Sequence, residues 1–179
     1  GFGAAEELLG GVLADARALR ERMVLASKGG IRPPVPYDSS EKGLRAACEA
    51  GHREGCVMLS LALIKGQPDL RTSEEAAELA RKPCADGVPE GCYALGTILH
   101  RELLPTGEIG AGTALDLFDR GCDGGHARSC DMLGRLHFAG RGGAAKDRRL
   151  AVDYYQRACK LGAELSCQKA EMPASRRIR

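Results

Sequence analysis

The chain has 179 residues, of which 44% are hydrophobic and 28% are charged, and its formal net charge is only +2. So small a charge excludes a strong electrostatic basis for nucleic-acid binding, and a composition with no tryptophan and 4% aromatic residues argues against base stacking. The longest apolar runs are far too short to span a bilayer, and no signal-peptide pattern is visible. The composition is typical of a single soluble repeat domain.

The two ends of the chain differ from its middle. Residues 4–26 are rich in alanine and leucine and predict a long leading helix. Pro33, Pro34 and Pro36 exclude a helix in the loop that follows. We therefore predict three parts: an N-terminal helix with a proline-rich loop at 1–39, a repeat domain at 40–172 and a basic tail at 173–179.

Eight cysteines define the repeat. They form four pairs with seven residues between the members of each pair, and the first members of successive pairs lie 36, 38 and 37 positions apart. The pairs are Cys48 and Cys56, Cys84 and Cys92, Cys122 and Cys130, and Cys159 and Cys167.

A reversal of the chain inside each pair is the only way to bring its cysteines together. In a continuous helix they would lie about 12 Å apart along the axis, at about 1.5 Å per residue. A glycine follows three residues after each first cysteine and predicts the end of a helix, because glycine adopts the left-handed conformation without steric cost. A small residue also precedes each second cysteine and leaves room for two helices to approach. The turn glycines are Gly51, Gly87, Gly125 and Gly162, and the small residues are Gly55, Gly91, Ser129 and Ser166.

Leucines follow the second cysteine of the first three pairs at the spacing of an amphipathic helix. These first helices also carry a small residue, Ser60, Gly96 or Gly134, at a position where a stacked helix would cross. The second helices are predicted at about 73–86, 112–124 and 147–161, the first of them starting with a capping box of Thr72 and Glu75. The predicted fold is all-α, an α/α solenoid of helical hairpins.

Paired cysteines with no odd member predict disulfides and hence an oxidising compartment. The alternative is that the cysteines are reduced and buried as small apolar residues. Zinc binding is disfavoured because no two cysteines have the spacing of a structural zinc site.

The segment from Cys130 to Cys167 reads CDMLGRLHFAGRGGAAKDRRLAVDYYQRACKLGAELSC. Its Leu133–Gly134 pair, glycine-rich loop, Lys146–Asp147 step and Tyr154–Tyr155 pair resemble the Sel-one-like (Sel1-like) repeats, which are related to tetratricopeptide repeats. The cysteine-bridged branch of this family includes the Helicobacter cysteine-rich proteins and a mitochondrial cytochrome c oxidase assembly factor. The resemblance covers about residues 40–170.

The resemblance implies a non-catalytic, protein-binding scaffold in the mitochondrial intermembrane space, either an assembly factor or an accessory subunit of cytochrome c oxidase. Its expected partners are protein subunits of a respiratory complex, and membrane contact would occur only through a partner or the basic tail. The alternative of the same kind is a periplasmic or secreted bacterial protein that binds envelope or host proteins. First helices usually line the binding face of such arrays. Outward residues on these helices are predicted to be Met58, Ser60, Tyr93, Thr97, Asp131 and Arg135, of which Tyr93, Thr97, Asp131 and Arg135 are the predicted partner-binding residues.

No catalytic, cofactor or metal site is predicted. The four histidines are scattered over three repeats, and His126 and His137 lie 11 positions apart, too far for one ion to bridge. Ser166 and Lys169 satisfy the serine-x-x-lysine pattern of β-lactam-recognising enzymes, but the companion motifs are absent. That enzyme remains an alternative which requires an exposed Ser166.

Overall fold

The computed structural model describes residues 40–104 and 112–171. The predicted leading helix and the basic tail lie outside these residues. The chain divides into two compact units between Gly43 and Leu44, and nearly all of the described residues belong to the second unit. None of the described helices is long and apolar enough to cross a bilayer.

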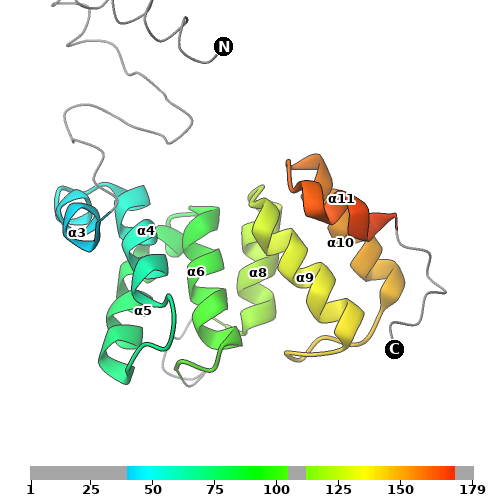
Figure 1. Cartoon of the computed structure of the whole chain (residues 1–179), viewed down its shortest axis with the longest axis horizontal. Helices are drawn as coiled ribbons and strands as arrows, with labels where there is room; N and C mark the ends of the chain where they lie inside the picture. The colour runs from blue at the N-terminus through cyan, green and yellow to red at the C-terminus, as the bar shows by residue number, and fades with distance from the viewer. Residues whose placement is uncertain (1–39, 105–111, 172–179) are drawn as a thin grey trace, which may run out of the picture. The chain divides into compact units, whose positions relative to one another are not determined.

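The described residues form eight helices and no strand, as the sequence predicts. The helices are arranged as four hairpins, in which a short turn joins each pair (Figure 1). The hairpins are α3 (Glu41–Glu49) with α4 (Arg53–Leu63), α5 (Leu70–Ala85) with α6 (Pro89–His100), α8 (Ala114–Asp123) with α9 (Ala127–Ala139), and α10 (Arg148–Lys160) with α11 (Glu164–Ala170).

A disulfide closes every hairpin, and the predicted pairing is confirmed at all four positions. The Cα–Cα distances of the bridges are 4.4, 4.5, 4.7 and 4.7 Å in chain order, within the range that a disulfide spans without backbone movement. All eight cysteines of the sequence lie in the described residues, and each belongs to one of these bridges.

The turn between each pair of cysteines depends on its glycine. Gly51, Gly87, Gly125 and Gly162 have φ angles of 86°, 83°, 90° and 94°, as predicted. In the first turn the amide of His52 donates to the carbonyl of Ala47 at 3.0 Å, and the other three turns repeat this bond. This closure satisfies carbonyl groups that the helix end leaves without a partner.

The helices stack in chain order, because each hairpin packs against the next through α4 with α5, α6 with α8, and α9 with α10. Two of the predicted small crossing positions lie directly under an aromatic ring. A Cβ atom on Gly96 would be 2.8 Å from Phe118 Cε1, and one on Gly134 would be 2.6 Å from Tyr155 Cδ1. In the first repeat Ser60 fills the same position and donates to the carbonyl of Ala76 at 2.7 Å.

Two details of the sequence interpretation are wrong. Ser60 was expected to point outward but is fully buried, because its hydroxyl finds a backbone acceptor inside the stack. The Thr72 and Glu75 capping box does not form. Asp69 caps α5 instead, its carboxylate accepting from the Thr72 amide at 2.7 Å, while Glu75 pairs with Arg45 of α3.

Candidate functional site

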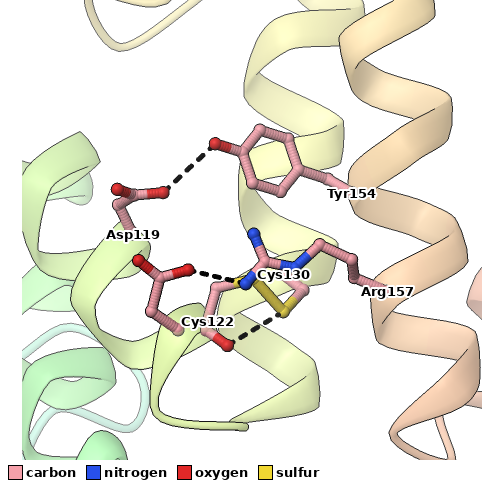
Figure 2. Close-up of polar contacts among 6 residues, drawn as sticks. Asp119, Cys122, Cys130, Tyr154 and Arg157 are labelled. Carbon is pink, nitrogen blue, oxygen red and sulfur yellow. Dashed lines mark hydrogen bonds and ion pairs between the residues drawn. A yellow bond between two sulfur atoms is a disulfide. The ribbon is translucent and has the colours of Figure 1, made fainter.

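Polar contacts that tie one repeat to the next surround the inner disulfides. At the third bridge, Tyr154 of α10 donates to Asp119 of α8 at 3.1 Å, and Arg157 pairs with Asp123 at 2.6 Å (Figure 2). Burial, with the neighbouring Asp119 carboxylate, raises the pKa of Tyr154. Figure 2 shows both side chains reaching from α10 across to the hairpin closed by Cys122 and Cys130. These groups hold neighbouring hairpins in register.

The predicted partner-binding residue Asp131 already has partners within the chain. Its carboxylate accepts from the Ser166 hydroxyl at 2.8 Å and pairs with the Lys169 ammonium group. Lys169 also lies over the ring of Tyr155, 5.2 Å from the ring centroid. Burial, with the Asp131 carboxylate and against the Arg135 guanidinium, raises the pKa of Tyr155 to about 12. Asp131 therefore holds α11 on the array.

The β-lactam alternative requires an exposed Ser166, and the same cluster buries this residue. Ser166 is 1% exposed, and its hydroxyl donates to the Asp131 carboxylate, which is itself paired with Lys169. The serine-x-x-lysine pattern places both side chains on Asp131 and serves a structural purpose here.

Replacing Asp131 should loosen the last helix. Asp131→Asn leaves Lys169 without its ion pair in a site where the carboxylate side chain is only 20% exposed, so we expect a loss of about 1 kcal/mol in the free energy of unfolding. Amide hydrogen exchange should rise in α11 and stay unchanged in α5 and α6. Unchanged exchange in α11 would show that the disulfide alone holds this helix.

Tyr93 and Thr97, two further predicted partner-binding residues, also make contacts within the stack. The Tyr93 ring lies 4.7 Å from the ring of His126 and 6.0 Å from that of Phe118, centroid to centroid. Thr97 donates to the carbonyl of Tyr93 at 2.8 Å in its own helix. Both side chains are partly exposed, so contact with a partner stays a prediction for them.

Arg135 differs from the other three predicted residues. It is exposed, and within the described residues its guanidinium makes one hydrogen-bond contact, to the sulfur of Met132 at 3.6 Å. Sequence reasoning did not connect it with Arg141, Lys146 and Arg149 in the following loop and at the start of α10. The signal was present as four basic residues between 141 and 149, but the sequence interpretation divided them between a glycine-rich loop and the helix predicted at 147–161.

His126 is expected to make stability depend on pH. Burial, assisted by Arg128 and opposed by Glu90, lowers the pKa of this histidine. The folded state therefore binds the proton more weakly than the unfolded chain. The contribution of His126 is fully present above the unfolded-state pKa of about 6.5 and is lost as the pH falls through the folded-state pKa.

Urea unfolding at about pH 7.5 and about pH 5 should show a smaller pH-dependent loss in His126→Asn than in the natural protein, because asparagine caps a helix but does not titrate. His100, whose pKa is also lowered by burial, titrates in both proteins and cancels in the comparison. An identical pH dependence in the two proteins would contradict the assignment.

No group of acidic, histidine or cysteine side chains among residues 40–104 and 112–171 has the arrangement of a metal site. His137 stacks on Tyr154 at 5.6 Å, and His126 lies beside Tyr93, so these two histidines are held by different neighbours.

The fold has counterparts among solved bacterial structures. Helicobacter pylori cysteine-rich protein B superimposes with a TM-score of 0.56 at 21% identity, over 73% of this chain and 96% of that protein. A Sel1 repeat protein from Oxalobacter formigenes gives a TM-score of 0.57 at 19% identity, over 74% of this chain and 54% of that one. The chain has the cysteine-bridged Sel1-like repeat fold.

The curated relatives of this Sel1-like array include assembly factors. Cytochrome c oxidase assembly factor 7 of Xenopus tropicalis is 27% identical over 139 residues, 75% of this chain and 60% of the relative. The mouse protein of the same name is 33% identical over 118 residues, covering 62% of this chain and 51% of the relative. The array thus spans about half to three fifths of these relatives. No family model matches the sequence.

A shorter match has higher identity. A 6-dehydroglucose reductase of the bacterium Novosphingobium aromaticivorans is 65% identical over 49 residues, which is 27% of this chain but only 16% of the reductase. A match to so small a part of the reductase is no basis for assigning the reductase activity to this chain.

Proposed function

We propose that the chain is a non-catalytic scaffold that binds protein subunits during the assembly of cytochrome c oxidase, or stays with the oxidase as an accessory subunit. One observation carries the proposal. The similarity to cytochrome c oxidase assembly factor 7 extends over 75% of this chain, far beyond one repeat. Stacked helical repeats bind partners through extended surfaces rather than through a catalytic pocket.

The four disulfides support an oxidising location for this function. Disulfides persist in oxidising compartments and are rare in the cytosol, where thiol systems keep cysteines reduced. The proposed location is the mitochondrial intermembrane space, since the partner complex proposed here assembles at the adjoining membrane.

Complementation tests the proposal directly. The chain would be produced in the intermembrane space of mouse cells that lack assembly factor 7, and oxidase activity and co-purifying oxidase subunits would be measured. Restored activity together with captured subunits is the expected result. A variant with Cys122→Ala and Cys130→Ala loses one inner bridge, so it should restore less activity and capture fewer subunits than the natural chain if the intact array is what binds. Failure of a folded, correctly located chain on both measurements would disprove the oxidase function.

The second candidate is a periplasmic or secreted bacterial protein that binds envelope or host proteins. It is favoured by the bacterial origin of the solved structures and of the 65% identical segment. Affinity capture from the periplasm and from mitochondria, with the same tagged protein, distinguishes the two. Specific capture of envelope proteins, with no oxidase subunit, would select the bacterial role.

A further inference from the structure

Four exposed cations, on the second half of α9, in the loop after it and at the start of α10, have no carboxylate partner among the described residues. They are Arg135, Arg141, Lys146 and Arg149, which we call the basic edge. Several other cations join one hairpin to the next. Arg157 and Lys169 pair with carboxylates of the preceding repeat, and Arg101 and Arg120 donate to backbone carbonyls there. The basic edge is therefore not required to hold the hairpins together.

The loop of the basic edge has a defined conformation. The His137 ring lies 3.1 Å from the carbonyl of Ala145, and the Asp147 amide donates to the carbonyl of His137 at 2.9 Å. The Ala144 amide donates to the carbonyl of Arg141, and the Ala144 side chain is 8% exposed. Because the backbone is already ordered, a ligand would pay little entropy to fix it.

None of the neighbouring carboxylates in the described residues forms an ion pair with the basic edge. Asp147, the acid within the loop, is occupied as the N-cap of α10, where it accepts from the amides of Arg149 and Leu150. Glu102 faces the same area through its interaction with His100. His100 in turn lies beside the loop, since a Cβ on Gly142 would be 3.7 Å from its Nδ1 atom. Asp131 and Asp153 each stand one helical turn from a cation of the basic edge, Arg135 and Arg149 respectively, but neither forms an ion pair with it. In the part of the chain that the structure describes, the four cations thus have no ion-pair partner, although acids are near them in the fold.

We infer that the basic edge binds an acidic segment of a partner protein. Three of its four cations are arginines, whose planar guanidinium groups can donate two parallel hydrogen bonds to one carboxylate. A membrane surface is less well matched, because interfacial binding combines cations with inserted apolar side chains. Among residues 40–104 and 112–171, the exposed large apolar residues are Met58, Leu70, Leu161 and Leu165, and all four lie outside this segment. The inference rests on the proposed protein-binding function and names the chemistry of the partner.

Binding of a fluorescent peptide of alternating glutamate and serine to the purified, disulfide-bonded protein tests this. Fluorescence anisotropy should show binding that weakens as salt is raised. The double variant Arg135→Glu with Arg141→Glu should bind at least about tenfold more weakly. The matched control is Arg128→Glu with Lys160→Glu. These residues are also exposed cations, but they lie at the ends of α9 and α10 opposite the loop. The control should change affinity by less than about twofold.

Parallel measurements identify the ligand. A peptide with glutamine in place of glutamate should not bind, and vesicles containing phosphatidylserine should bind no better than neutral vesicles. Circular dichroism checks that all variants fold. Equal loss in the two double variants, or binding to anionic vesicles without binding to the peptide, would overturn the inference. Because the assay uses purified protein, it can succeed or fail independently of the oxidase complementation.

Discussion

Gly96→Ala is expected to destabilise the protein by about 2 kcal/mol, although alanine is the better helix residue by about 1 kcal/mol. The new Cβ would lie 2.8 Å from Cε1 and 2.9 Å from Cδ1 of Phe118. The ring is fully buried and cannot move aside without displacing α8. Urea unfolding of the oxidised protein measures the change.

A double-mutant cycle shows whether the ring is the cause. Phe118→Ala removes all the ring atoms that the new methyl group would meet, at a cost of its own. In that background Gly96→Ala should be neutral or slightly stabilising, because the helix preference of alanine remains. If Gly96→Ala lowers the free energy of unfolding by the same amount in both backgrounds, the contact with the ring does not limit this helix crossing.

Removal of an inner disulfide is the second large effect. Cys122→Ala with Cys130→Ala should lower the free energy of unfolding by about 2 to 3 kcal/mol, the chain-entropy value for a loop of this size. Both cysteines are buried, at 2% and 0% exposure, so lost packing adds to the entropic cost. Thermal and urea unfolding of this variant are compared with the natural protein.

The four bridges should also differ in how readily they are reduced. The cysteines of the two end bridges, Cys48–Cys56 and Cys159–Cys167, are partly exposed. The cysteines of the two inner bridges, Cys84–Cys92 and Cys122–Cys130, are buried. Mild reduction followed by alkylation and mass spectrometry should therefore label the two end bridges first, with the inner ones labelled only as the array unfolds. Simultaneous labelling of all four bridges would mean that access does not control reduction.

The contacts that join the repeats explain why the array depends on both kinds of bond. Tyr154 to Asp119 and Arg157 to Asp123 each span about one repeat of sequence, and the disulfides act only within a hairpin. Loss of a bridge should thus open one hairpin, while loss of a polar tie should loosen the junction between two. Repeat arrays behave in this way because each unit contacts only its neighbours.

Several features could be predicted from the sequence because they depend on local chemistry. The spacing of Cys122 and Cys130, with Gly125 between them, determines a reversal and a disulfide wherever the hairpin stands in the array. The repeat period and the absence of strand patterns determine the helical fold. The start of α5 was placed wrongly, because Asp69 and Thr72 both have the chemistry of an N-cap and sequence alone did not choose between them.

Only the tertiary structure decided which polar residues remain available to a partner. Asp131 and Arg135 stand one turn apart on the same helix, yet α11 neutralises Asp131 and leaves Arg135 exposed. The basic edge likewise emerges only when the fold brings Arg135 and the loop after α9 near His100. Local patterns specify helices and turns, whereas the pairing of charges depends on which distant segments the packing places within bonding distance.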